Sequence, residues 1–350
     1  IVHYMCQESL IRYLDNTVNN CAKTYQDFGD AQTNLFGNTA KAQSSFTHEQ
    51  NNITVPKEDI DTFIRKGFFA VENDLRILKE GKETRTYQFK ISESVRLHAD
   101  LLDQKLADIK ICDPAIGSGA FPVGLLHELV NAQLVLKQYL SEKYLNKKLQ
   151  ILGVTRNEIE SQPNKYNYLV KRHTIQESIY GVDIDASAID IARLRLWLSL
   201  VVDEENLNDI EALPNLDYKI VCGNSLIGLP ENAMRNLEVE KELEALKEEF
   251  FVVTDETHKK ELRNQINTKI RQLLDTAEEF AGYKIDFDFK LFFSEVWHHK
   301  SGFDVVIGNP PYVRVQGIPY ELIDIYKEKY QLAYKRIDIS ILFTERALSL

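Results

Sequence analysis

Apolar and polar residues follow a helical rhythm through the first third of the chain. From Ile1 to Leu14, and again over residues 62–108, apolar residues recur at helical spacing, so each stretch is predicted to be helical with one buried side. Residues 26–61 lie between them and are rich in Asn, Gln, Thr, Ser and Gly, which is typical of a long polar loop. We therefore predict an N-terminal helical region over residues 1–108 that contains this loop.

Beyond residue 108, short apolar runs alternate with helical segments. These runs have the length of strands rather than helices, and they cover residues 109–112, 179–182, 218–222 and 303–307. Helical segments are predicted from about Phe121 and through residues 189–200. Strands that alternate with helices predict an α/β fold, in which helices cover both faces of a parallel sheet. Residues 109–350 are the predicted core.

One long stretch inside this core lacks the character of strands. Residues 230–285 carry two helical stripes of apolar residues, over 239–250 and 262–277, in a background dense in Glu and Lys. A turn is predicted near Thr254 and Asp255, so the simplest interpretation is an antiparallel helical hairpin inserted into the core. Packing, DNA contact and partner contact are the roles considered for the hairpin, and packing is favoured.

The composition is that of a globular protein and excludes several other classes. Hydrophobic residues make up 44% and charged residues 27% of the 350 positions. No apolar run approaches the ~20 residues of a membrane helix, and no signal-peptide pattern opens the chain. The four cysteines lie far apart without a CxxC pair. This spacing argues against a disulfide framework or a zinc site, so we expect a cytoplasmic protein without a metal site.

Net charge and the chain ends add two expectations. The formal net charge of −11 counts against nucleic-acid binding as a property of the whole chain. A DNA enzyme would therefore need its positive charge on one face, or on a region outside this sequence. Ile1 is not an initiator residue, and the chain stops within an apolar, helix-like stretch. We therefore expect a fragment that lacks the last strands of its fold.

Four segments that follow predicted strands carry candidate chemistry, and the first is Asp113-Pro114-Ala115-Ile116-Gly117-Ser118-Gly119-Ala120-Phe121, here called the glycine turn. Gly117 and Gly119 let backbone approach a ligand closely, and the helix that follows offers free N–H groups to an anion. Asp113, at the end of its strand, can attract an ammonium group. A site for a carboxylate and an ammonium suits the amino-acid end of S-adenosylmethionine better than a pyrophosphate. A glycine pair alone is also common in purely structural turns.

The second and third segments follow the next two predicted strands. Gly181-Val182-Asp183-Ile184-Asp185 places an acidic residue where doubly wound nucleotide-binding proteins hold ribose hydroxyls, and Asp183 is preferred to Asp185 for this role. Ile184 can cover one face of a cofactor adenine. In Gly223-Asn224-Ser225-Leu226, the Asn224 amide can hydrogen-bond the adenine edge. Solvated carboxylates and a plain turn are the structural alternatives at these positions.

The fourth segment, here called the catalytic loop, is Asn309-Pro310-Pro311-Tyr312, after an apolar strand and Gly308. The amine of adenine is a poor nucleophile, because its lone pair is delocalised into the ring. Acceptors on the amine hydrogens, Asn309 Oδ1 and the Pro310 carbonyl, would free that lone pair, and both prolines stiffen the loop. Tyr312 offers a flat face to a base swung out of the duplex. A rigid turn with a packed tyrosine is the structural alternative.

The four segments, taken in order, resemble motifs I to IV of the amino-methylating DNA methyltransferases. Their sequences are DPAIGSGAF, GVDID, GNSL and FDVVIGNPPY. Residues 1–14 resemble the motif X helix, and residues 337–343 resemble the helix after the catalytic loop. With motif X first, the order is similar to that of the gamma class, whose target-recognition region is C-terminal. The alpha class instead places this region between motifs III and IV, where the helical insertion lies. The sequences of these motifs are similar to those of large type IIG restriction–modification proteins, which fuse a nuclease, a methyltransferase and a recognition domain.

The resemblance implies a Rossmann-like S-adenosylmethionine-dependent methyltransferase core and assigns roles to residues. The implied cofactor contacts are Asp113, Ala115, Gly117, Gly119, Asp183, Ile184, Asn224 and Ser225, and the implied target contacts are Asn309, Pro310, Pro311 and Tyr312. Two features depart from the family pattern. Motif III usually carries Asp where this chain has Asn224, and the Thr-Pro pair expected before Ile1 is missing.

The implied reaction is direct transfer of the cofactor methyl group to the N6 amine of a flipped adenine in a specific sequence of double-stranded DNA, without a covalent enzyme intermediate. The alternatives are N4-cytosine methylation, protein glutamine methylation and a non-catalytic methyltransferase-like subunit. Cytosine C5 methylation is disfavoured, because it needs a nucleophilic Cys, typically after Pro, and no cysteine here follows one. The chain would be the modification part of a restriction–modification system, with nuclease and target-recognition domains expected in the parent protein.

Overall fold

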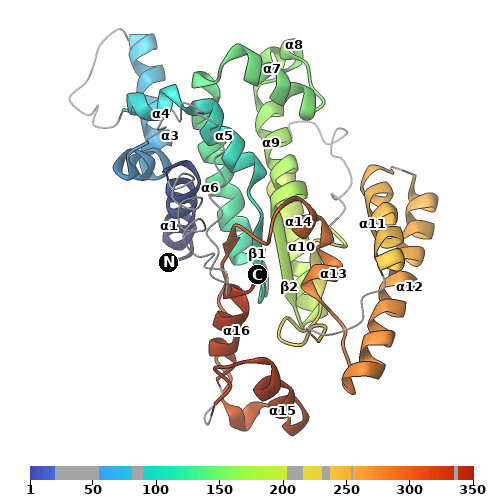
Figure 1. Cartoon of the computed structure of the whole chain (residues 1–350). Coiled ribbons are helices and arrows are strands. Elements are labelled where there is room, and N and C mark those ends of the chain that lie inside the picture. Colours follow the sequence, from blue (N-terminus) through green and yellow to red (C-terminus); the bar gives the residue numbers. More distant parts are fainter. Residues whose placement is uncertain (20–54, 81–89, 203–215, 231–236, 254, 335–337) are drawn as a thin grey trace, which may run out of the picture. The chain divides into compact units, whose positions relative to one another are not determined.

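The computed structural model describes the chain except for residues 20–54, 81–89, 203–215, 231–236, 254 and 335–337 (Figure 1). The chain divides into two compact units. The first unit is Ile1–Asp108 with His127–Gln162, and the second is Ile109–Leu126 with Pro163–Leu350. The predicted boundary after residue 108 coincides with one edge of the first unit. Residues 127–162, which the sequence analysis placed in the core, group with the first unit.

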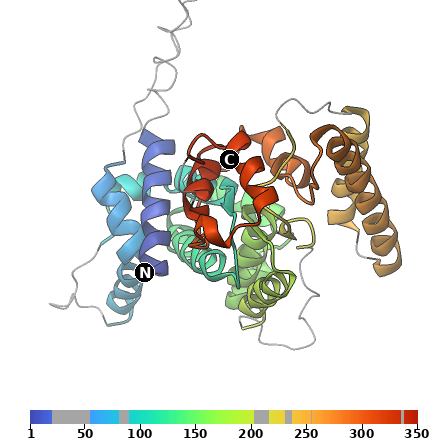
Figure 2. The same cartoon turned by 90° about the horizontal axis from the view of Figure 1, so that it is seen from below.

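Helices build the first unit. The N-terminal helix α1 (Val2–Leu14) buries Cys6, Leu10 and Leu14, so the predicted one-sided helix is confirmed. It lies beside α3 (Lys57–Glu80), as Figure 2 shows. The other elements of the unit are η1 (Asp15–Asn19), α4 (Glu93–Leu97), α5 (Ala99–Asp108), η2 (Lys137–Tyr139), α7 (Glu142–Ile151) and α8 (Arg156–Ser161), together with the last part of α6 (Ala120–Leu136).

The polar loop predicted over residues 26–61 ends earlier than expected. Helix α3 begins at Lys57, so the prediction was wrong for its last five positions, and residues 20–54 lie outside the described part of the chain. Glu58 and Asp59 favour a helix start there, because acidic side chains interact well with the amino end of the helix dipole. Burial of Ile60 and Phe63 adds the apolar contacts that hold this first turn in place.

A parallel sheet of four strands forms the centre of the second unit, which confirms the predicted α/β class. Its strands are β1 (Ile111–Asp113), β2 (Ile179–Asp183), β3 (Ile220–Cys222) and β4 (Val305–Val306), in the order β3-β2-β1-β4. The chain moves outward from β1 through β2 to β3 and then returns to the other side of β1 for β4. The strand order therefore reverses between β1 and β4, which is where open α/β sheets bind ligands.

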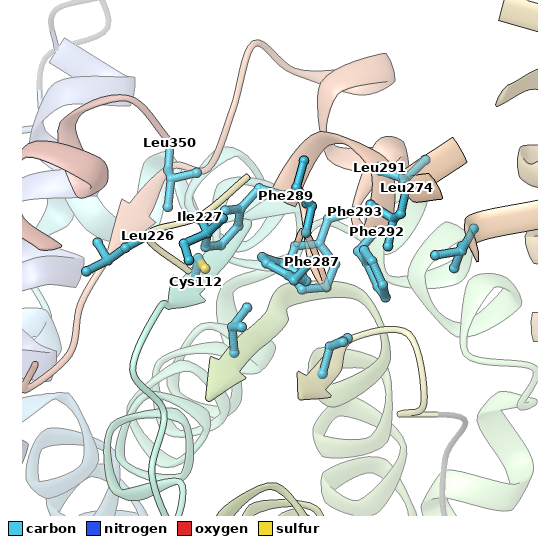
Figure 3. Close-up of a cluster of buried hydrophobic side chains, with 14 of the residues drawn as sticks. Cys112, Leu226, Ile227, Leu274, Phe287, Phe289, Leu291, Phe292, Phe293 and Leu350 are labelled. Atoms are coloured by element: carbon cyan, nitrogen blue, oxygen red, sulfur yellow. The ribbon is translucent and has the colours of Figure 1, made fainter. Parts of the chain in front are cut away.

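Helices cover both faces of this sheet, because the crossovers run in opposite directions. Helices α9 (Pro163–Ser178) and α10 (Ala186–Val201) pack against β2 on the crossovers from β1 to β3. The return to β4 carries α13 (Phe289–Phe292) and α14 (Ser294–His299). An aromatic cluster around Phe287, Phe289 and Phe293 (Figure 3) packs on inward-facing strand residues such as Tyr180, whose ring centre lies 5.1 Å from that of Phe293.

The predicted helical hairpin is confirmed by α11 (Leu237–Val252) and α12 (Glu256–Ala281), which lie side by side in both views (Figures 1 and 2). Asp255 caps α12 by accepting the His258 N–H at 2.7 Å, so the predicted turn position holds at this residue. The apolar stripes face each other, and in the second stripe Leu274 is more deeply buried than its neighbour Leu273. The buried Lys247 of α11 donates to the carbonyls of Leu291 and Phe292, which ties the hairpin to the segment that covers the sheet.

Candidate functional site

The glycine turn leaves the carboxyl end of β1 and is tied to the end of β2 by two hydrogen bonds. The Ile116 N–H donates to the Val182 carbonyl at 2.9 Å, and the Gly117 N–H donates to Asp183 Oδ2 at 2.8 Å. Gly181 has no side chain to block this approach, since a Cβ there would lie 2.3 Å from Ile116 Cδ1. The structure therefore brings the first and second predicted segments together at one edge of the sheet.

The two glycines of the turn have different structural roles. Both adopt left-handed backbone, with φ of 51° at Gly117 and 82° at Gly119, so a side chain is disfavoured at each. A Cβ at Gly119 would lie 3.1 Å from the Cβ of Ala192, so this glycine lets the turn pack on α10. A Cβ at Gly117 would meet nothing within 4 Å, so the backbone here is open to a ligand. An open backbone turn at the start of α6 fits the carboxylate end of an amino acid.

Asp113 lies at the bottom of the site, 1% exposed, where β1 meets β4. Its Oδ1 accepts the Ala115 N–H at 3.1 Å. Burial raises the pKa of this carboxyl to about 7, and the nearby charge of Asp183 adds to the rise, while the Ala115 hydrogen bond opposes it. Gly308 packs directly on this carboxylate, because a Cβ there would lie 2.5 Å from Asp113 Oδ1. The first and fourth segments therefore touch at the point where the strand order reverses.

The carboxylates after β2 have separate roles. Asp185 accepts the Ser187 N–H at 2.9 Å and caps α10, so its side chain serves the helix. Asp183 Oδ1 accepts the Asp185 N–H at 3.0 Å, and its other oxygen holds Gly117. Ile184 between them is 70% exposed although its side chain is large and apolar. This arrangement favours Asp183 as the polar contact for a ligand beside the glycine turn, and Ile184 as its apolar cover.

The third segment is engaged within the protein more than the sequence suggested. Ser225 is buried, and its hydroxyl donates to the Pro114 carbonyl at 2.6 Å, which braces the glycine turn. The Asn224 side chain accepts the Leu226 N–H at 3.0 Å and also hydrogen-bonds the Tyr326 hydroxyl. Both side chains are thus placed beside the predicted cofactor site, but their polar groups face the protein.

The catalytic loop follows β4 and is exposed. Ile307 is held to β1 by donating its N–H to the Cys112 carbonyl at 3.0 Å, and Asn309 follows Gly308, the residue that packs on Asp113. Asn309 and Tyr312 are exposed, the latter by 76%, and the Tyr312 hydroxyl lies 3.5 Å from Asn309 Oδ1. The loop ends where the Ile339 N–H donates to the Val313 carbonyl at 3.0 Å, so α16 (Ile339–Leu348) supports it. The helix predicted over residues 337–343 is confirmed from Ile339 onward.

Three residues next to the site were missed by the sequence analysis. Arg195 of α10 donates to the carbonyl and hydroxyl of Ser118, at 3.2 and 3.1 Å, and so holds the glycine turn from outside. Tyr326 belongs to α15 (Tyr320–Lys329), an unpredicted helix that packs on the third segment. Asp286 Oδ1 accepts the Asn224 N–H at 3.2 Å from beyond the hairpin. An arginine in a largely apolar helix was a signal for Arg195, whereas Asp286 carries no local signal at all.

The parallel sheet reverses its strand order beside β1, and the glycine turn and the Asn-Pro-Pro-Tyr loop lie at this reversal, so the second unit is a doubly wound α/β structure. Residues 177–350 match the family described as Eco57I restriction-modification methylase. The chain belongs to this family through its C-terminal half, and the family carries the methyltransferase fold.

Curated relatives are similar over parts of the chain. A protein of Methanocaldococcus jannaschii, provisionally named a type II restriction enzyme and methyltransferase (RM.MjaORFECS2P), is 36% identical over 157 residues, which are 43% of this chain and 11% of that protein. The type II restriction enzyme and methyltransferase RM.Eco57I of Escherichia coli is 28% identical over 258 residues, 72% of this chain and 19% of the relative. The type II methyltransferase M.PaeR7I of Pseudomonas aeruginosa is 53% identical over 47 residues, 13% of this chain and 8% of that enzyme. The chain thus spans less than a fifth of each of these relatives.

No helix in the described ranges is both long and apolar enough to cross a membrane. Within the same ranges, no three His, Cys, Asp or Glu side chains are grouped as metal ligands would be.

Proposed function

We propose that this chain is the catalytic part of an S-adenosylmethionine-dependent methyltransferase that methylates the N6 amine of adenine in double-stranded DNA, within a restriction–modification protein. The contact between Gly308 and Asp113 carries the proposal, because it joins the catalytic loop to the glycine turn at the reversal of the strand order. A loop for the substrate and a turn for the cofactor must meet for direct group transfer.

The residues present fit S-adenosylmethionine, which supplies an electrophilic methyl group when bound. The open backbone at Gly117 and the start of α6 would hold its carboxylate, and the ionised form of Asp113 would pair with its ammonium group. Asp183 would accept hydrogen bonds from the ribose hydroxyls, and the exposed Ile184 would cover the adenine.

The catalytic loop would orient the target amine. Asn309 Oδ1 and the Pro310 carbonyl would accept its two hydrogens, which disfavours delocalisation of the nitrogen lone pair and turns it toward the methyl group. The exposed Tyr312 ring would stack on the flipped base and exclude water from one face. Catalysis would then rest on positioning and on fixed acceptors, with no covalent enzyme intermediate.

The relatives support DNA as the substrate, since they are named as type II restriction enzymes or methyltransferases. Their names do not specify the methylated base, and the same two acceptors would also serve the N4 amine of cytosine. The Asn-Pro-Pro-Tyr motif favours adenine as the methylated base. Nuclease and target-recognition domains are proposed for the rest of the parent protein, because the relatives extend far beyond the matched region.

Transfer of labelled methyl groups to duplex DNA by the full-length protein tests the proposal, with the product identified after digestion to nucleosides. Asn309→Ala is expected to lower the transfer rate by about 100- to 1,000-fold, as for loss of one fixed polar group in other active sites. Affinity for S-adenosylhomocysteine is expected to stay close to that of the unmodified protein, because Asn309 lies outside the cofactor contacts.

Tyrosine variants provide a matched control. Tyr312→Ala removes the proposed stacking face, whereas Tyr320→Ala removes a second exposed tyrosine that lies outside the loop. Transfer should fall in the first variant only. N4-methylcytosine as the product would replace adenine by cytosine, label on protein glutamine would move the substrate to protein, and cofactor binding without any transfer would make the chain a non-catalytic subunit.

A further inference from the structure

We infer that Asp286 is an additional cofactor-binding residue, whose Oδ2 accepts a hydrogen bond from the exocyclic amine of the cofactor adenine. This inference rests on the proposed function, since it needs S-adenosylmethionine in the site. The residue lies outside all four segments singled out in the sequence, and it reaches the site only through the fold.

The backbone around Asp286 is fixed by its neighbours. Ile285 and Phe287 are buried on either side, so the intervening Asp286 side chain is turned outward, and its residue is exposed. Phe287 lies against the turn after β3, because a Cβ at Gly223 would be 2.3 Å from Phe287 Cβ. Gly223 is therefore the residue that allows this segment to run along the end of the strand.

The carboxylate itself is oriented from one side. Its Oδ1 accepts the Asn224 N–H at 3.2 Å, which aligns the group with the third segment. Within the described part of the chain, Oδ2 has no hydrogen-bond partner, and it is therefore available to a donor from a ligand. Asp183 differs in this respect, because both of its carboxylate oxygens already accept backbone N–H groups.

The surroundings place this free oxygen on the adenine side of the site. Cys222 at the end of β3 lies 3.6 Å, through its Sγ, from the carbonyl oxygen of Ile184. Burial raises the pKa of this thiol, and Asp286 is the first of three carboxylates that add to the rise, ahead of Asp183 and Asp185. The carboxylate of Asp286 is thus close to the ends of β2 and β3, where Ile184 exposes its apolar face.

The exocyclic amine of adenine is the ligand group that best fits the Asp286 carboxylate. An adenine that packs on Ile184 presents an amine whose hydrogens need acceptors, and a carboxylate is a stronger acceptor than a neutral amide. Asn224 occupies the position where the related motif usually has Asp, but its side chain is hydrogen-bonded to Leu226 and Tyr326. Asp286 therefore supplies the acidic group that this motif position lacks.

Binding measurements with two cofactor products test the inference. S-adenosylhomocysteine carries the amine, whereas S-inosylhomocysteine carries a carbonyl oxygen in its place, which would face the Asp286 carboxylate without a hydrogen bond. Isothermal titration calorimetry on the full-length protein should show that the adenosyl compound binds about 10- to 100-fold more tightly, as expected for loss of a hydrogen bond to a charged group. No activity measurement is needed for this readout.

Asp286→Asn should abolish or reverse this preference, because an amide whose Oδ1 stays on the Asn224 N–H presents an NH2 donor in place of Oδ2, and this donor suits the inosyl carbonyl rather than the adenine amine. The variant keeps an Oδ1 acceptor for the Asn224 N–H, so the local fold is retained, and thermal denaturation checks this. Asp185→Asn is the matched control, since it removes the same charge nearby while Asn still caps α10. The preference for the adenosyl compound should persist in that control.

The outcomes separate the two proposals. If the unmodified protein prefers the adenosyl compound and Asp286→Asn retains the full preference, or if no preference exists, the assignment of Asp286 is overturned. If the folded, unmodified protein binds neither compound, the proposed methyltransferase function fails first. Loss of the preference in Asp286→Asn alone supports the assignment.

Discussion

At the scale of single residues, Asp113 is a buried carboxylate whose proposed role in cofactor binding would come at the expense of stability. A carboxylate that is 1% exposed and accepts one backbone N–H is poorly solvated, and its pKa is raised from 3.8 to about 7. The ionised form is the one that would attract an ammonium group. Binding and folding therefore make opposite demands on this side chain.

Asp113→Asn should separate these two demands. The folded protein keeps a proton on Asp113 that the unfolded chain loses, so the stability of the unmodified protein falls as the pH rises from about 4 to about 7. The amide variant has no such loss. Its melting temperature should exceed that of the unmodified protein by an amount that grows across this range and is constant above it.

The affinity for S-adenosylhomocysteine should change in the opposite direction to the stability. At pH 8, Asp113→Asn should bind S-adenosylhomocysteine more weakly by calorimetry, because the charged partner of the ammonium group is gone. In the unmodified protein, affinity should rise with pH through about 7 as Asp113 ionises. A variant that is both less stable and equally able to bind would show that Asp113 is a structural residue only.

At the scale of elements, a buried ion pair joins two helices of the first unit. Lys148 of α7 donates to both carboxylate oxygens of Asp103 of α5 at 2.7 Å, and to Gln133 Oε1 at 2.9 Å. The Tyr144 hydroxyl donates to the same carboxylate at 2.9 Å. Because Asp103 is fully buried, its charge depends on these partners.

Lys148→Ala is expected to lower the free energy of unfolding by about 3–5 kcal/mol, since it leaves the Asp103 carboxylate without its counter-charge. Urea denaturation followed by circular dichroism measures this change. Lys147→Ala on the same helix removes an exposed lysine and should change stability by no more than about 0.5 kcal/mol. Adding Asp103→Asn to Lys148→Ala should recover part of the loss, and equal destabilisation by the two lysine variants would contradict the role of the pair.

Elements with a clear period were predictable from the sequence, and those that depend on distant contacts were not. The hairpin and the four strands follow from local apolar patterns, and the glycine turn and catalytic loop follow from their residue types. The order β3-β2-β1-β4 does not, because strand pairing is set by packing between segments far apart. Asp286 contacts Asn224, which is 62 positions away in the sequence. No local pattern in the sequence predicts this contact.

The hydrogen bonds made by the side chains of the third segment were also not predictable, because their partners are distant in sequence. The structure brings Asn224 and Ser225 beside the glycine turn, yet the sequence could not show that Tyr326 and Pro114 would take up their hydrogen bonds. Helix α15, which brings Tyr326, was not predicted from the sequence. A turn residue can therefore be assigned to a site from sequence, while the direction of its polar group requires the fold.

At the scale of the whole molecule, every proposed cofactor contact belongs to the second unit. The glycine turn lies within Ile109–Leu126, and the other segments lie within Pro163–Leu350. A ligand that binds only the folded form stabilises the structure that forms its site, by about 2.7 kcal/mol at 100 times its Kd. Whether this stabilisation reaches the first unit depends on whether the two units unfold together.

Hydrogen exchange with and without S-adenosylhomocysteine distinguishes these cases. We expect slower exchange at the amides of β1, β2 and the glycine turn, with the Ile116 and Gly117 N–H groups as the most direct reporters because both are bonded to the end of β2. Amides of α3 and α5 should be unchanged, since those helices belong to the first unit alone. Equal protection in both units would mean that they unfold as one cooperative structure, so that cofactor binding stabilises the N-terminal helices as well as the sheet.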